Sequence, residues 1–332
     1  NGIDIMTTET TCLSSIWATD DAAKHHSDIH ERPDDYRELQ PGDVAYYDMM
    51  IRIDLSQQEA MIALPFHPSN AVTIHELQAD PVGILTRIEE DAKKRFGTKV
   101  DVHLVDKVVD GKVHADQGII AGCSGGTYDN LAEAGAILKG KSIGNDYFTA
   151  SAYPQSTPVS MAVTREGITA DLMEAGVVMK PAFCGPCFGA GDVPSNNGLS
   201  IRHTTRNFPN REGSKPGQGQ LSLVALMDAR SIAATAANGG VITAATDVAY
   251  ENTHKPYQYD DKIYKCRVYN GFGKARPETE LRYGPNIKDW PTMYPMAENM
   301  LVELAAVIHD PVTTTDELIP SGEMSSYRSN PL

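Results

Sequence analysis

Two cysteines separated by glycine and proline, in Cys184-Gly185-Pro186-Cys187, carry the most specific chemistry in this sequence. Two thiols at this spacing either cycle through a disulfide or hold a metal centre. A third cysteine, Cys123, lies upstream in the turn Gly122-Cys123-Ser124-Gly125-Gly126. The chemistry therefore depends on whether the fold brings Cys123 to the pair.

The cysteine pair has the sequence of a thioredoxin-like redox dithiol. That mechanism needs the first thiol at the start of a helix, where the helix dipole lowers the thiol pKa. The segment that follows is Phe188-Gly189-Ala190-Gly191-Asp192-Val193-Pro194, and its two glycines and proline disfavour a helix. The pattern thus argues against a redox role.

The turn around Cys123 also fits the Gly-x-Ser-x-Gly pattern of hydrolases, and it lies between an expected strand and an expected helix. A hydrolase would use Ser124 as nucleophile, with a histidine and an acid further along. His203, His254 and His309 follow in the sequence, but none lies in a motif. Most matches to so short a pattern are accidental turns.

A third interpretation uses all three cysteines. Three thiolates can hold three irons of a [4Fe-4S] cluster and leave the fourth iron open, whereas electron-transfer clusters usually have four cysteine ligands. An open iron is a Lewis acid that can bind a hydroxyl and a carboxylate. Cysteines alone are often only small buried hydrophobes, so they do not decide the question. The loop His203-Thr204-Thr205-Arg206-Asn207-Phe208-Pro209-Asn210-Arg211 adds two guanidinium groups, which pair bidentately with carboxylates.

The elements that must position these residues alternate between strand and helix. We expect strands at residues 118–121, 148–153, 177–179, 199–203 and 221–226, and helices at 127–138, 158–175 and 229–237. This alternation predicts an α/β fold with a largely parallel sheet. Outside this region we expect helices at 20–28, 81–96 and 296–308, and strands at 47–55 and 60–64.

Composition limits the partners. The chain has 332 residues and a net charge of -15, which disfavours nucleic acid or an anionic membrane as the main partner. Hydrophobic residues make up 41% of the chain, and no apolar run approaches the ~20 residues of a membrane span. Five cysteines, an odd number, favour reduced thiols and a cytoplasmic location over a disulfide scaffold.

Taken in order, the Cys123 turn, the Cys184 to Cys187 pair and the arginine loop resemble the aconitase and isopropylmalate-isomerase family of iron-sulfur hydro-lyases. That family has a Gly-Ser-Cys-Thr-Asn turn, then a Cys-x-x-Cys pair, then Asn-Arg-Asn-Phe-x-Gly-Arg. The resemblance implies that Cys123, Cys184 and Cys187 bind a [4Fe-4S] cluster. It also implies that Arg206 and Arg211 bind a small hydroxy di- or tricarboxylic acid, which the enzyme dehydrates and rehydrates.

The resemblance extends to the N-terminal segment. Met6-Thr7-Thr8-Glu9-Thr10-Thr11 is similar to the family's Met-Gly-Ala-Glu-Ile-Gly, which places Glu9 on an active-site glutamate. The implied fold consists of three-layer α/β/α domains. Residues 1–112 correspond to part of a second domain, 113–247 to the cluster-binding domain, and 248–332 to a linker toward a swivel domain, as in a hydratase branch of the family.

The family's histidine-aspartate pairs lie in its first domain and its catalytic serine in its mobile fourth domain, and neither region is found here. We therefore expect the isolated chain to be inactive without the remaining domains of the full-length protein.

The sequence also departs from the family pattern around the cysteines. Gly122 replaces the usual Ser, Ser124 and Gly125 replace Thr and Asn, Thr205 replaces Asn, and Asn210 replaces Gly. These changes leave the substrate open. They also support an alternative, a non-catalytic binding or regulatory protein that keeps the fold.

Overall fold

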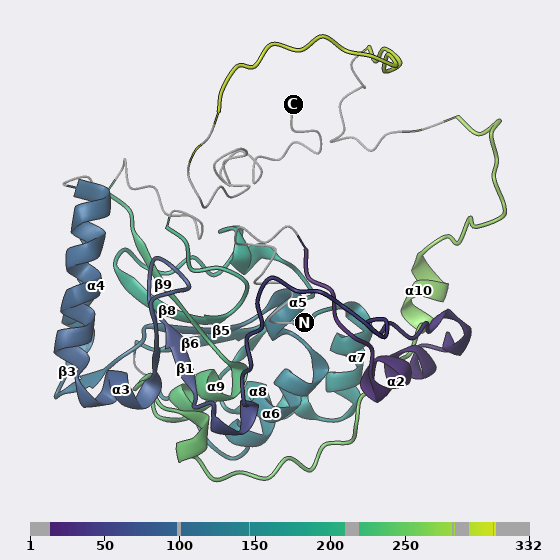
Figure 1. Ribbon diagram of the computed structural model, residues 1–332. Coiled ribbons are helices and arrows are strands. Elements are labelled where there is room, and N and C mark those ends of the chain that lie inside the picture. Colours follow the sequence, from purple (N-terminus) through teal and green to yellow (C-terminus); the bar gives the residue numbers. More distant parts are fainter. Residues whose placement is uncertain are drawn as a thin grey trace.

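A computed structural model describes residues 14–97, 101–145, 147–209, 219–280, 282, 292–307 and 309. A seven-stranded sheet with the order β2-β1-β9-β8-β5-β6-β7 forms its centre (Figure 1). The strands from β5 to β9 pair in parallel, and β1 pairs antiparallel with both β2 and β9. The sequence prediction of an α/β fold with a largely parallel sheet is confirmed.

The parallel strands are short, and all but β7 are largely buried. In β8 every residue but the last is buried, as expected where a parallel sheet is covered on both faces. The strands of this sheet are β1 (Met61–Ala63), β2 (Ala71–Thr73), β5 (Gln117–Ile120), β6 (Thr149–Ala152), β7 (Val178–Met179), β8 (Gly198–His203) and β9 (Ser222–Met227). A separate hairpin joins β3 (Val108–Val109) to β4 (Lys112–Val113).

Four helices pack together below the sheet in Figure 1: α6 (Tyr128–Leu138), α7 (Thr157–Arg165), α8 (Ile168–Glu174) and α9 (Ala229–Ala237). Side-chain oxygens cap three of them: Thr127 caps α6, Ser156 caps α7 and Asp228 caps α9. The single helix expected at 158–175 is divided into α7 and α8. Gly167 adopts a left-handed conformation with φ 80° between them, which glycine accepts at little cost.

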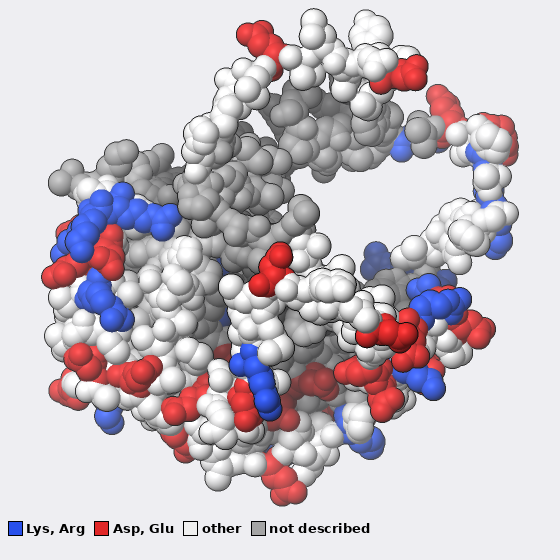
Figure 2. All heavy atoms as spheres, in the orientation of Figure 1, with Lys and Arg blue, Asp and Glu red and all other residues white. Residues whose placement is uncertain are grey.

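The other helices are α2 (Asp21–Ile29), α3 (Ile74–Ala79), α4 (Pro81–Phe96), α5 (Gly122–Gly125) and α10 (Lys262–Arg267). Single 3₁₀ turns occur at Pro33–Asp35, Leu55–Gln57, Val105–Lys107, Gly185–Cys187 and Ala245–Asp247. The predicted helix at 81–96 is confirmed with both ends: Asp80 caps it, proline occupies its first turn and Gly97 ends it. In its last turn Lys93 lies 3.8 Å from Glu89 and Lys94 lies 3.0 Å from Asp91. Positive and negative charges are likewise interspersed over the described surface in Figure 2.

Two sequence predictions are wrong. Residues 47–55 form no strand, although their apolar residues alternate, and Ile51 and Leu55 are 76% and 77% exposed. Residues 296–307 form no helix, and Leu301 there is fully exposed. Periodicity stabilises an element only when its apolar side packs against something, and neither segment reaches the core.

The boundary expected near residue 112 stays a prediction. Strand β1 precedes it and β9 follows it, yet Ile62 pairs with Met227 and Ala63 with Leu226. Because β5, β6, β7 and β8 run parallel, their carboxyl ends meet at one edge of the sheet. The loops that leave this edge carry the three candidate cysteines and Arg206.

Candidate functional site

The turn that carries Cys123 is pressed against the ends of two strands. It follows β5 and forms the one-turn helix α5. A Cβ on Gly125 would lie 2.0 Å from the carbonyl oxygen of His203, at the end of β8. A Cβ on Gly126 would lie 2.1 Å from the carbonyl oxygen of Tyr153, just after β6. The two glycines of the motif are therefore needed for this close approach.

The pair Cys184 and Cys187 lies in a 3₁₀ turn after β7. Cys187 is 3% exposed and Cys184 is exposed. A hydrogen bond with Cys184 and burial raise the pKa of the Cys187 thiol far above its usual value, while contacts with Thr205 oppose the shift. A Cβ on Gly122 would lie 3.6 Å from the sulfur of Cys187, so the pair touches the Cys123 turn.

Cys123 shares this environment. Burial and then the charge of Cys187 raise the pKa of the Cys123 thiol, whereas backbone N–H groups and the charge of Arg206 lower it. These interactions place the three thiols and one guanidinium in a single neighbourhood. That the three cysteines bind one metal centre stays a prediction.

The three thiols are soft sulfur donors of the kind that hold iron-sulfur clusters. Within the described ranges, no three His, Cys, Asp or Glu side chains are arranged to hold one metal ion. In a cluster each cysteine binds a different iron, so the ligands stand further apart. Ser124 Oγ, Thr204 Oγ1 and Asn207 Oδ1 are buried without a hydrogen-bond partner in the described part of the chain. Such atoms from the cysteine and arginine loops are ready to bond an added group.

The loop that carries Arg206 is fastened to β1. The side chain of Asn207 is 1% exposed and donates to the carbonyl oxygens of Ala63, at 3.2 Å, and Leu64, at 2.7 Å. The ring of Phe208 packs edge-on against His67, with centroids 5.8 Å apart. Arg206 precedes Asn207 in this loop and is half-buried, and its charge acts on the Cys123 thiol. Arg211 and Glu9 lie outside the described residues.

Comparison with known proteins now decides the family. The family model described as "Aconitase family (aconitate hydratase)" matches residues 1–234. The chain belongs to the aconitase family. This match covers both the strands that position the cysteines and the loop that carries Arg206.

The curated relatives of this aconitase-family chain include several named isopropylmalate dehydratases. It is 28% identical over 242 residues to "3-isopropylmalate dehydratase large subunit 2" of Rubrobacter xylanophilus, covering 73% of this chain and 48% of the relative. It is 27% identical over 199 residues to the large subunit of Campylobacter fetus, covering 60% and 40%. It is 30% identical over 169 residues to that of Thermococcus kodakarensis, covering 51% and 35%. The chain thus spans less than half the length of these relatives.

The two alternatives to cluster binding have little support at this aconitase-family site. Among the described residues no α-helix follows the Cys184 turn, so the first thiol of the pair does not lie at the start of a helix, as a redox dithiol requires. The hydroxyl of Ser124 is buried and has no hydrogen-bond partner in the described part of the chain. A hydrolase nucleophile needs a base within hydrogen-bond reach.

Sequence reasoning named His203 only as a possible hydrolase histidine and gave it no place beside the Cys123 turn, although it lies at the end of β8. His203 Nδ1 accepts a hydrogen bond of 3.1 Å from the backbone N–H of Ala229, at the start of α9. Burial lowers the pKa of His203, although the charge of Asp228 opposes the shift. The ring is therefore held neutral near neutral pH, beside the Cys123 turn. Its position at the end of a buried strand was the available signal.

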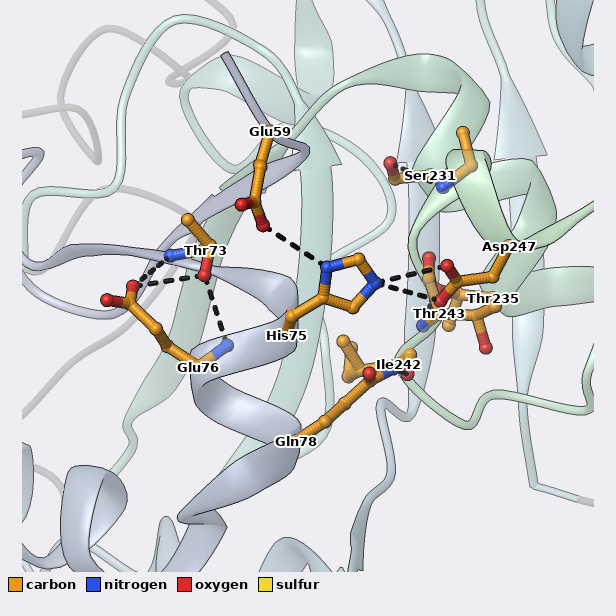
Figure 3. A network of polar contacts seen from close by, with 11 residues as sticks. Glu59, Thr73, His75, Glu76, Gln78, Ser231, Thr235, Ile242, Thr243 and Asp247 are labelled. Carbon is orange, nitrogen blue, oxygen red and sulfur yellow. Dashed lines mark hydrogen bonds and ion pairs between the residues drawn. The ribbon is translucent and has the colours of Figure 1, made fainter. Parts of the chain in front are cut away.

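A second group of polar side chains fastens α3 to the segment after α9 (Figure 3). His75 Nε2 lies 3.0 Å from Asp247 Oδ1, and His75 Nδ1 lies 3.2 Å from Glu59 Oε2. Gln78 Nε2 donates to the carbonyl oxygen of Ile242 at 3.0 Å. Hydrogen bonds with Asp247 and Glu59 raise the pKa of His75. These contacts border a cavity of about 500 Å³ whose lining includes no cysteine.

Within the described ranges, each helix is too short or too polar to cross a lipid bilayer.

Proposed function

We propose that this chain is the cluster-binding part of an aconitase-like hydro-lyase that dehydrates and rehydrates a small hydroxy di- or tricarboxylic acid. The observation that carries the proposal is the convergence of Cys123, Cys184 and Cys187 with Arg206 at one edge of a parallel sheet. Family membership supports it, because aconitase-family proteins generally bind a [4Fe-4S] cluster. When bound, such a cluster supplies a Lewis acid for the substrate hydroxyl.

The residues of the chain supply positioning and charge. The three thiols are the proposed ligands, and Cys187 must lose its proton to act as one. Burial and the hydrogen bond with Cys184 raise its pKa, and a bound metal would favour the thiolate. Arg206 is proposed to pair with a substrate carboxylate, since a guanidinium fork matches a carboxylate. Arg211 and Glu9 are proposed as a second carboxylate ligand and an active-site acid.

Anaerobic reconstitution with iron and sulfide tests the cluster. The full-length protein should take up about four irons and four sulfides per chain and gain a broad visible absorption band. Cys123→Ser should lower the iron content and alter that band. Cys266→Ser is the matched control, because Cys266 is an exposed cysteine on α10 and should not affect loading. Equal loading of Cys123→Ser and the unaltered protein would contradict the ligand assignment.

Substrate binding is tested on Arg206. Replacing it with Lys keeps the charge but loses the fork, so KM should rise about tenfold to 100-fold with the correct acid. Arg230→Lys is the control, because Arg230 is exposed and its side chain pairs with Asp228. The names of the relatives make 3-isopropylmalate the first acid to test, followed by citrate and homocitrate. An unchanged KM for every acid would refute the role of Arg206.

Turnover is proposed to need more protein than this chain. The relatives are named large subunits, and the chain covers 48% or less of the three described above. We propose that further domains of the same protein, or a partner polypeptide, complete the site.

The alternative of a non-catalytic binding protein keeps one observation in its favour, the departures from the family pattern at Ser124 and Thr205. A folded full-length protein that takes up no iron would favour it.

A further inference from the structure

Arg202 is a fully buried cation in the middle of the sheet. It lies on β8 and is 0% exposed, which makes it one of the largest fully buried side chains of the described residues. On its sheet side, Nε donates to Ser200 Oγ at 2.8 Å and Nη2 to Gln117 Oε1 at 3.2 Å. Ser200 Oγ itself donates to Gln117 Oε1 at 2.8 Å, so two neighbouring strands hold the base of the guanidinium.

The other side of the same guanidinium holds the loop of the cysteine pair. Nη1 donates to the carbonyl oxygen of Pro186 at 2.6 Å, inside the Cys184 to Cys187 turn. Nη2 donates to the carbonyl oxygen of Asp192 at 2.8 Å, where the loop leaves the turn. The backbone hydrogen bonds within the turn are local, such as Cys187 N to Cys184 O. They give the turn its shape but do not attach it to the sheet.

A second contact supports the same loop from Tyr153, just after β6. The hydroxyl of Tyr153 donates to Asp192 Oδ2 at 2.5 Å. Burial and this hydrogen bond raise the pKa of Tyr153, so the hydroxyl stays protonated and able to donate. Asp192 is therefore held through its carboxylate by Tyr153 and through its backbone by Arg202.

Burying a guanidinium is costly, because the charge leaves water and cannot be neutralised by losing a proton. The four acceptors named above are neutral oxygens on two strands and at both ends of the loop. A lysine at this position could not reach acceptors on two strands and at both ends of the loop, since its donors radiate from one nitrogen. The hydrogen bonds therefore depend on the fork of the arginine side chain.

We propose that Arg202 is the positioning residue of the cysteine pair: it fixes the Cys184 to Cys187 turn against the sheet and presents a permanent positive charge to whatever anion the thiols hold. The second part rests on the proposed function, because the anion there is an iron-sulfur cluster with thiolate ligands. The first part concerns the metal-free protein alone. The two parts make separate predictions, one about the fork and one about the charge.

The fork is tested by alkylation of the metal-free protein, followed by mass mapping of each cysteine. In the unaltered protein Cys187 should react far more slowly than Cys266, because Cys187 is buried and Cys266 exposed. Arg202→Gln and Arg202→Lys should both accelerate Cys187 by about tenfold or more, since each removes charge-assisted hydrogen bonds to the loop. Cys266 serves as the internal reference and should keep its rate.

A variant that keeps Arg202 and a control at another arginine allow the clamp to be tested even if the Arg202 variants do not fold. Ser200→Ala leaves the guanidinium in place and removes one of its acceptors, so Cys187 should react about threefold faster even if the Arg202 variants do not fold. Arg165→Lys, at an exposed arginine paired with Asp260, should change nothing. If Cys187 stays within about twofold of its original rate in Ser200→Ala and in any folded Arg202 variant, the clamp is refuted.

The charge is tested by the reduction potential of the reconstituted cluster. Removing a buried positive charge near a cluster lowers its potential, so Arg202→Gln should shift it to more negative values. Arg202→Lys should retain most of the original potential while still exposing Cys187. If Arg202 only stabilised the fold, the Lys and Gln variants would not differ in reduction potential while both expose Cys187 to alkylation. Equal potentials in the Gln and unaltered proteins would refute the electrostatic part. Failure of the unaltered protein to load iron would refute the proposed function and leave the alkylation result standing.

Discussion

Gly125→Ala tests whether the Cys123 turn depends on its contact with β8. An alanine Cβ would lie 2.0 Å from the carbonyl oxygen of His203, whereas ordinary van der Waals contacts begin at 3.4 Å. The added Cβ is fixed to the backbone of the turn, and the His203 oxygen belongs to the backbone of β8, so neither atom can rotate away. The turn must therefore move by roughly the difference between these two distances, which is more than about 1 Å. The backbone of Gly125 is helical, so alanine itself would otherwise be tolerated or slightly favourable.

The expected loss of stability is about 3 kcal/mol, at the upper end of the cost of overpacking, because no flexible side chain can absorb the strain. Urea unfolding followed by far-UV circular dichroism measures it. Gly42→Ala is the control, since nothing lies within 4 Å of the Cβ it would add. The same variant should lose iron on reconstitution, because the displaced turn carries Cys123. A Gly125→Ala protein with unchanged stability and iron content would refute the close-approach argument.

Three further predictions concern side chains away from the cysteines. His75 has a raised pKa, so its ion pairs stabilise the fold fully below the unfolded pKa of about 6.5, and this contribution is lost as pH rises through the folded pKa. His75→Asn should abolish that slope in urea unfolding measured from pH 5 to 9, and an unchanged slope would exclude His75 as its source. Asn207→Ala should cost about 2 to 3 kcal/mol, because two buried carbonyl oxygens lose their donor; a loss below 0.5 kcal/mol, roughly the size of a surface change, would show that the loop is held otherwise. Asp228→Ala should cost about 1 kcal/mol through its cap on α9, whereas Asp228→Asn should cost little, and equal losses in thermal unfolding would contradict a capping role.

Local patterns predicted most of the cluster-binding region. Residues 117–120, 149–152, 178–179, 198–203 and 222–227 are strands close to where the apolar runs placed them. The helices α4, α6 and α9 also have nearly the predicted ends, because capping side chains and glycines mark them. The predicted helix at 158–175 is divided in two at Gly167. A glycine is a known signal for a helix end, but the prediction followed the apolar pattern that continues past it.

Hydrophobic periodicity gave wrong predictions for two segments that pack against no other element among the described residues. The alternation at residues 47–55 has the form of a strand, but the segment pairs with no strand among the described residues and its apolar side chains are exposed. The predicted helix at 296–308 fails for the same reason over its described residues. Hydrophobic periodicity states which face would be buried, but not whether anything is there to bury it.

The sequence by itself determined the inventory of the site: three cysteines in two glycine-rich turns and an arginine loop, each placed after a strand. Only the tertiary structure decided how these parts meet. Parallel pairing brings the ends of β5, β7 and β8 to one edge, which places Cys123 beside Cys187 and Arg206. The tertiary structure also buries Arg202 completely and brings its guanidinium to the carbonyl oxygen of Pro186. Burial and long-range hydrogen bonds depend on neighbours distant in the sequence, so no local pattern carries them.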